Sequence, residues 1–118
     1  WAHWCGDCKQ QAPILARLQR DFSDKGLVVI APTRYYGYAA QGEEATPEVE
    51  KKYTEKVLQN FYSQLKGMPV TLDDETFFNY GASTTPTLVL IDTKGIVKLY
   101  HPGKMTYEEL AEKIRAAS

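Results

Sequence analysis

The stretch Trp4-Cys5-Gly6-Asp7-Cys8 contains both cysteines of the chain, in a C-x-x-C spacing. Two thiols at this spacing can close a small disulfide with little movement of the backbone. If a helix begins at Cys5, its unpaired backbone N–H groups and its dipole favour a thiolate at that position. A thiolate is the species that attacks disulfides, so the stretch offers a two-electron redox centre.

Two other uses of a C-x-x-C pair are a zinc site and a structural disulfide. A structural zinc site needs about four ligands, and beyond the two cysteines the chain offers only His3, His101 and carboxylates. A disulfide across so short a loop constrains the unfolded chain only weakly. We therefore interpret the pair as redox-active.

Composition indicates one globular domain over residues 1–118. The formal net charge of −1 gives no sign of a nucleic-acid or anionic-membrane partner. No apolar run approaches the roughly 20 residues of a membrane span, and no basic-then-apolar leader is present. The count of cysteines alone does not indicate a compartment.

Hydrophobic periodicity and turn signals predict alternating helices and strands, which is typical of an α/β layer fold. The predicted elements are a helix over 5–24 with a kink at Pro13, a buried strand over 27–31, a loop over 34–46, a long helix from 46 to near Gly67, a short strand over 69–72, a short helix from 73, a hairpin with strands 87–91 and 96–100, and a last helix from 106.

Three helix boundaries have explicit signals. Gly26 is a plausible C-cap for the first helix, and Thr46-Pro47 supplies an N-cap followed by proline at the first helical position. Thr106 and Glu109 form a capping box. The buried residues predicted for the last helix are Leu110 and Ile114, and those predicted for the middle helix are Val49, Tyr53, Val57, Phe61 and Leu65.

The C-x-x-C pair, the preceding Trp4, the proline within the first helix and the Thr85-Pro86 pair together resemble the thioredoxin superfamily. The run from Thr84 to Asp92, with Gly95, is similar to the TlpA-like branch, the exported thiol–disulfide oxidoreductases of bacteria. The resemblance covers nearly the whole chain except about 34–68, where the loop and helix look extended. It implies a central mixed sheet flanked by helices.

In that family a central strand leads into the tryptophan, and it would precede Trp1. A sheet lacking this strand exposes an apolar slot with unpaired backbone groups. We therefore expect such a slot, and we expect residues 1–118 to be a fragment of a longer chain; the alternative is that another segment fills the place of this strand.

The resemblance also implies roles for individual residues. Cys5 would be the nucleophile and Cys8 the resolving cysteine. Pro86 would be a cis-proline lying against the disulfide, and the Thr85 backbone would be free to pair with an extended substrate. An X-Pro bond can be cis at small cost, although a strand-entry proline is the simpler alternative. Trp4 would offer an apolar platform beside the disulfide, or else be partly buried against the helix.

Gly6, Asp7 and Lys9 are the residues expected to tune the pair. Asp7 occupies a position where the family commonly has proline, and its charge should oppose thiolate formation at Cys5. This predicts a reducing protein, unless Asp7 points to solvent and matters little. Lys9 could stabilise a thiolate or simply be solvated. Gln11 stands where several relatives have glutamate, and it cannot accept a proton.

Other polar and aromatic residues allow two interpretations. Tyr35, Tyr36 and Tyr38 would line a substrate groove or pack beneath the inserted helix. His3 is expected at the surface, and His101 is expected to be structural or solvated.

The resulting expectation is an extracytoplasmic thiol–disulfide oxidoreductase that acts on protein substrates, as a reductase. It would be a monomer with no metal or organic cofactor, and its electrons would come from another protein, typically a membrane reductase in the TlpA-like branch. The alternatives are a copper-delivery module using Cys5, Cys8 and a histidine, and a relative of the thiol peroxidases.

Overall fold

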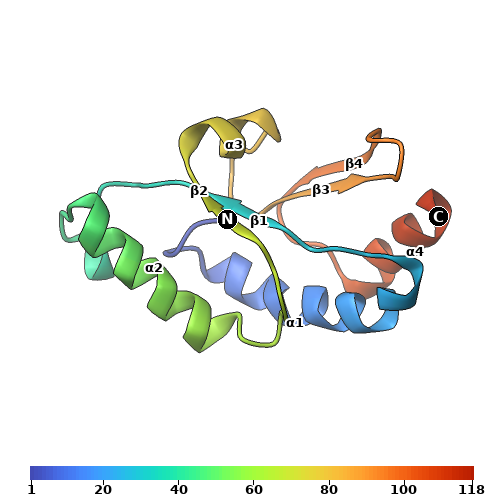
Figure 1. The fold of residues 1–118 in the computed structure, drawn as a ribbon, viewed down its shortest axis with the longest axis horizontal. Coiled ribbons are helices and arrows are strands. Elements are labelled where there is room, and N and C mark those ends of the chain that lie inside the picture. Colours follow the sequence, from blue (N-terminus) through green and yellow to red (C-terminus); the bar gives the residue numbers. More distant parts are fainter.

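The computed structural model describes residues 1–118 as helices on both faces of short strands (Figure 1). Helices α1, α2 and α4 lie on one side of the strands, and the short helix α3 lies on the other. The elements are α1 (Gly6–Asp21), η1 (Ser23–Lys25), β1 (Ala31–Thr33), η2 (Ala40–Gly42), α2 (Pro47–Phe61), β2 (Val70–Leu72), α3 (Asp74–Asn79), β3 (Thr87–Ile91), β4 (Val97–Pro102) and α4 (Tyr107–Ala117).

The strands form two separate two-stranded sheets. β1 pairs in parallel with β2, with Pro32 opposite Thr71. β3 and β4 form the predicted antiparallel hairpin, with Val89 opposite Tyr100. The structure is thus mixed α/β, with one parallel and one antiparallel strand pair.

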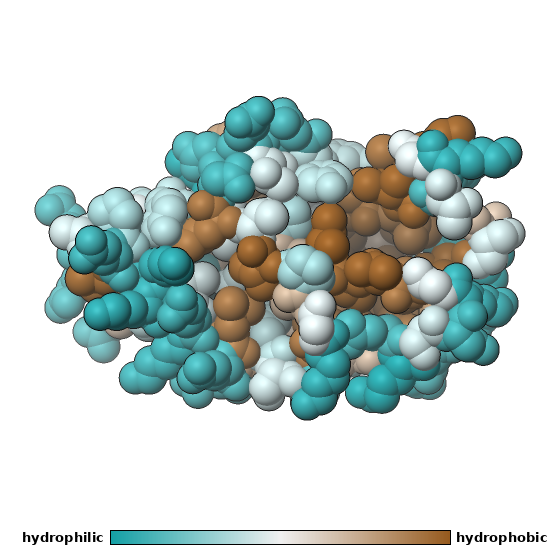
Figure 2. All heavy atoms as spheres, viewed as in Figure 1, coloured by the Kyte–Doolittle hydropathy of each residue, from teal (hydrophilic) through white to brown (hydrophobic).

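An apolar cavity of about 710 Å³ lies between the two sheets, which confirms the expected slot. Its lining comes from the 27–32 segment, from β3 and from the inner faces of α1 and α4. In Figure 2, apolar side chains gather around the hollow between the hairpin and the segment leading into β1.

The strand predicted over 27–31 is wrong in position, because β1 begins only at Ala31. The residues before it border the slot, where no strand lies beside them to complete a backbone ladder. Val28 is 71% exposed and Ile30 is 45% exposed. An apolar β-branched run predicts a buried strand only when a partner strand is present on each side.

Helix α1 begins at the cysteine pair, as expected. Cys5 is its N-cap in an extended conformation, and the helix continues through Pro13 to Asp21. The η1 turn follows, and Gly26 ends it with a φ of 84°, a left-handed conformation that glycine adopts without strain. The predicted C-cap is therefore wrong for α1, whose C-cap is Phe22; Gly26 instead caps the turn that follows the helix.

Helix α2 begins as predicted, with the Thr46 hydroxyl accepting from the Val49 N–H. It ends at Phe61 rather than near Gly67, and its buried face was predicted only in part. Val49 and Phe61 are 53% and 50% exposed. The buried residues of the helix are Glu50, Thr54 and Val57, so Val57 is confirmed, and Leu65, beyond the end of the helix, is buried as predicted. The helix is turned so that a carboxylate, rather than Val49, faces the interior.

Two buried clusters support these elements. The first cluster surrounds the cysteines and includes residues of α1 and α2. The second cluster joins α1 to α4. The first consists of Ala2, Cys5, Cys8, Ala12, Ala16, Val57, Tyr62 and Leu65. The second consists of Leu18, Phe22, Met105, Leu110, Ala111 and Ile114, so the predicted burial of the α4 residues is confirmed.

None of the helices combines the length and apolarity needed to cross a membrane.

The capping box at the start of α4 gives a direct test of the fold. Thr106 accepts from the Glu109 N–H, and the Glu109 carboxylate accepts from the Thr106 N–H. Thr106→Ala should lower the free energy of unfolding by about 1 kcal/mol, because one helix donor loses its acceptor. Urea titration measures this. Thr93→Ala, in the exposed hairpin turn, is the control, and equal losses in the two variants would contradict the cap's role.

Candidate active site

The two cysteines form a disulfide at the N-terminus of α1. Their Cα atoms are 5.3 Å apart. The Cys5 sulfur accepts a hydrogen bond of 3.1 Å from the Cys8 backbone N–H, which is one of the helix donors without an intrahelical acceptor. When the disulfide is reduced, this donor and the helix dipole stabilise negative charge on Cys5. Cys8 lies in the first turn, and its sulfur receives no such hydrogen bond because Cys8 is the donor.

Burial of the whole residue does not distinguish the two cysteines, because each is only 3% exposed. Cys8 also lines the apolar slot. The difference between the two thiols is therefore electrostatic: Cys5 lies at the N-cap and Cys8 lies inside the helix.

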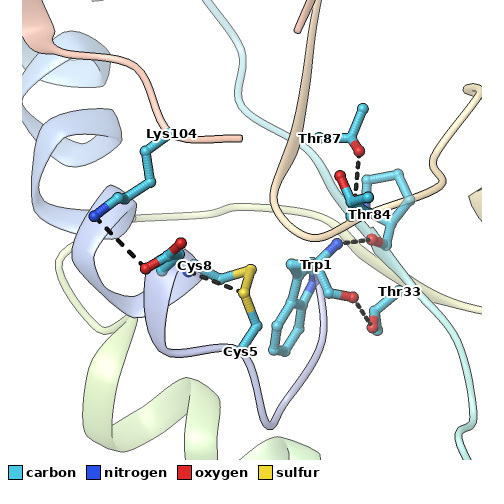
Figure 3. The surroundings of a disulfide bond; sticks show 9 residues. Trp1, Cys5, Cys8, Thr33, Thr84, Thr87 and Lys104 are labelled. Carbon is cyan, nitrogen blue, oxygen red and sulfur yellow. Dashed lines mark hydrogen bonds and ion pairs between the residues drawn. A yellow bond between two sulfur atoms is a disulfide. The ribbon is translucent and has the colours of Figure 1, made fainter. Parts of the chain in front are cut away.

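The segment before the disulfide is tied to β1. The Trp1 indole N–H donates to the Ala31 carbonyl at 2.9 Å, and the Trp1 carbonyl accepts from the Thr33 hydroxyl (Figure 3). The Cys5 N–H then donates to the Ala2 carbonyl, closing a tight turn. The strand and the turn together fix where Cys5 enters the helix.

A groove of about 350 Å³ begins beside this turn. Trp4 is 48% exposed and its ring packs edge-on against Tyr36, with centroids 5.6 Å apart. Both rings line the groove, together with Arg34, Phe77, Phe78, Ser83, Thr84 and Thr85. The predicted residues Trp4 and Thr85 thus meet at one concave surface, and Trp4 remains half open to solvent.

The Thr85–Pro86 peptide bond is cis. Pro86 is buried, and its carbonyl accepts a 2.7 Å hydrogen bond from the Gly103 N–H after β4. Pro86 and Cys8 border the same slot, so the proline loop and the disulfide both contribute to the lining of one cavity.

The tyrosines after β1 divide between the two interpretations. Tyr36 both lines the groove and packs on Trp4. Burial raises the pKa of Tyr36 to about 12, so its phenol is neutral throughout the physiological range. Tyr38 packs against the His3 ring at 5.7 Å and does not line the groove. Tyr35 is also absent from the groove lining.

Asp7 is exposed and ion-paired. Its carboxylate lies 3.5 Å from the Lys104 ammonium, and the two side chains are 57% and 45% exposed. Lys104 also donates to the Gln10 side chain at 2.7 Å. Asp7 therefore faces solvent, as one of the two alternatives expected. Its charge is also partly offset by Lys104, from the loop before α4.

The remaining residues expected to tune the pair have separate environments. The Lys9 ammonium lies 4.3 Å from the centre of the Phe61 ring. A side chain at Gly6 would meet nothing within 4 Å, so no steric contact requires glycine there. Gln11 is buried and exchanges two hydrogen bonds with the Met105 backbone, at 3.0 and 2.9 Å. Its amide therefore fastens α1 to the loop before α4.

The expectation that His3 lies at the surface is wrong, because it is 1% exposed. Its Nε2 lies 3.1 Å from a carboxylate oxygen of Glu50, which is fully buried. The rings of Tyr36, Tyr38 and Tyr53 surround the imidazole edge-on. Sequence reasoning missed this pair, since Glu50 follows the helix start and resembles an ordinary first-turn acid.

The metal-binding alternative gains no geometric support. No group of three or more His, Cys, Asp or Glu side chains lies close enough together to hold a metal ion. His3 is engaged with Glu50, and His101 lies on β4 opposite Leu88.

Comparisons with known proteins agree with this geometry. No protein-family model matches the sequence. The chain is 27% identical over 116 residues to the thioredoxin-like protein YneN of Bacillus subtilis, covering 97% of this chain and 59% of that protein. It is 29% identical over 119 residues to the thiol-disulfide oxidoreductase ResA of Bacillus cereus, covering 98% and 58%. The chain thus spans less than two thirds of these curated relatives.

A solved structure gives a fuller match. The crystal structure of a protein described as thiol:disulfide interchange protein DsbE, from Chlorobium tepidum, superposes with a TM-score of 0.74 at 30% identity. The alignment covers 99% of this chain and 74% of that one.

The charge pair beside the disulfide predicts opposite shifts in reduction potential. Asp7→Asn removes a charge that opposes the Cys5 thiolate, so it should raise the potential of the pair. Lys104→Met removes the offsetting charge and should lower it. Because both side chains are exposed, each shift should stay below about 20 mV. Equilibration with a glutathione or dithiothreitol buffer measures the potential.

The control for this pair of shifts is Lys113→Met, on the exposed face of α4. It removes the same charge far along the chain from the disulfide and should leave the potential unchanged. Shifts of the same sign in the Asp7 and Lys104 variants would show that the pair does not act electrostatically on the disulfide.

Proposed function

We propose that this chain, which belongs to the thioredoxin-like thiol–disulfide oxidoreductases, reduces disulfides in protein substrates through Cys5 and Cys8. The observation that carries the proposal is the Cys5 sulfur at the N-terminus of α1, hydrogen-bonded by the Cys8 N–H and disulfide-bonded to Cys8. The family supplies the reaction class. The geometry supports the assignment of the attacking and resolving roles.

The proposed reaction begins with the reduced pair. The Cys5 thiolate attacks one sulfur of a substrate disulfide, a Cys5–substrate bond forms, and the other substrate sulfur leaves as a thiolate that takes up a proton. The Cys8 thiolate then attacks the Cys5 sulfur and expels the second substrate thiolate. Two electrons pass from the pair to the substrate, and the Cys5–Cys8 disulfide seen in the structure is the product.

The surroundings of the pair support a protein substrate. The groove of Trp4, Tyr36 and Thr85 opens beside the active-site turn, and it has room for a side chain of an extended segment. By the family resemblance, the Thr85 backbone pairs with that segment and Pro86 lies against the disulfide. Each round then requires a separate protein reductant to restore the dithiol.

The direction as a reductase is supported by Asp7. A carboxylate in the first turn of α1 disfavours the Cys5 thiolate, and so disfavours the reduced form on which a strong oxidant depends. Lys104 offsets part of this effect. An extracytoplasmic location, a membrane reductase as electron donor and a monomeric state are further parts of the proposal, and they rest on the resemblance to the TlpA-like branch.

Cysteine variants test the roles. The reduced chain should reduce insulin disulfides, Cys5→Ser should abolish this activity, and Cys8→Ser should stop at a mixed disulfide through Cys5. Non-reducing electrophoresis with mass spectrometry identifies the trapped cysteine. Activity that survives Cys5→Ser, or a substrate trapped on Cys8, would refute the assignment.

The reduction potential of the wild-type Cys5–Cys8 pair tests the direction of electron transfer. A reductase should equilibrate well below the roughly −120 mV of a strong oxidant. A value close to that oxidising end would contradict the reductase proposal while leaving the exchange chemistry intact.

A further inference from the structure

A buried carboxylate, Glu50 of α2, lies behind the active-site turn. It is fully buried, and it faces three donors. One oxygen lies 2.7 Å from the Tyr36 backbone N–H and 3.1 Å from His3 Nε2, and the other lies 2.9 Å from the Gly37 N–H. A buried carboxylate is costly unless its oxygens are hydrogen-bonded, and here both are.

These donors come from two separate parts of the site. His3 belongs to the turn that presents Trp4 and Cys5, and it is 1% exposed. Tyr36 and Gly37 belong to the loop after β1. One carboxylate therefore joins the turn that carries the nucleophile to the loop that supplies one side of the groove.

The joined parts meet again at the groove. The Tyr36 ring packs edge-on against Trp4 at 5.6 Å and against His3 at 5.9 Å. The Arg34 guanidinium lies 5.2 Å from both the Tyr36 and the Phe78 rings. It is also paired with Asp74 at 3.0 Å, so its charge is already compensated. The groove thus presents aromatic faces with little net charge.

We propose that Glu50 is a positioning residue for substrate binding: it holds Tyr36 against Trp4 so that the two rings form one wall of the groove. The groove receives an extended substrate segment that carries a large apolar side chain next to its cysteine. This inference rests on the proposed reductase function, and it assigns the residue that shapes its substrate preference.

The chemistry of the three donors explains why a carboxylate is needed. A glutamine side chain has the same shape but only one acceptor oxygen. Whichever way the amide turns, its NH₂ group faces the backbone N–H of Tyr36 or of Gly37. One of these part-buried N–H groups then loses its acceptor, and the loop shifts to satisfy it.

The experiment compares Glu50→Gln with the wild-type chain on three disulfides. Two are mixed-disulfide peptides that differ only in the residue beside the cysteine, tryptophan or serine. The third is oxidised glutathione, which is too small to span the groove. For Glu50→Gln, kcat/KM for the tryptophan peptide should fall about tenfold, through KM. The serine peptide and glutathione should change by less than about twofold.

Glu55→Gln is the matched control, because it removes one carboxylate from the exposed face of the same helix. It should leave all three rates unchanged. A purely structural role for Glu50 would lower all three rates together, in proportion to the folded fraction measured by circular dichroism. That result, or unchanged rates in Glu50→Gln, would overturn the inference.

If Glu50→Gln does not fold, Tyr36→Ala tests the same inference. It removes the wall and leaves the carboxylate in place, so the preference for the tryptophan peptide over the serine peptide should disappear. A preference that persists in this variant, or is absent from the wild type, would overturn the inference. Failure of the wild-type chain to reduce any of the three disulfides would instead refute the proposed function.

Discussion

The hydrogen bond from the Cys8 N–H to the Cys5 sulfur is the interaction on which the site depends. It exists because Cys5 is the N-cap of α1, where a backbone donor has no helical acceptor. The helix is held in place by the buried contacts of α1 with α4 and by the exchange of hydrogen bonds between Gln11 and Met105. The reactivity of the Cys5–Cys8 pair therefore depends on packing contacts from distant parts of the chain.

Two acidic side chains of the site have opposite environments and opposite roles. Asp7 is exposed, paired with Lys104 and screened by solvent, so it adjusts the potential only slightly. Glu50 is fully buried and bonded to His3 and to two backbone donors, so it fixes geometry rather than charge. In our proposal the same functional group thus tunes the thiol in one place and shapes the substrate groove in the other.

Local signals in the sequence were enough for the redox pair, the N-terminal ends of α1, α2 and α4, and the β3–β4 hairpin, because each depends on neighbours a few residues away. The 27–31 run was misplaced, since a strand depends on partners that a local pattern does not contain. His3 and Glu50 lie 47 positions apart, and their hydrogen bond is decided by how α2 is rotated. An apolar face counted from Val49 places Val57 correctly but puts Val49, rather than Glu50, in the interior.

The central claim is that Cys5, and not Cys8, carries the reactive thiolate. Brief treatment of the fully reduced chain with limiting iodoacetamide near neutral pH, followed by peptide mass spectrometry, tests it directly. Because each cysteine is 3% exposed, a difference in rate would reflect the helix terminus rather than access. Alkylation of Cys5 well before Cys8, with equal rates in denaturant, is the predicted result. Alkylation of Cys8 first, or of both at the same rate in the folded chain, would contradict the account.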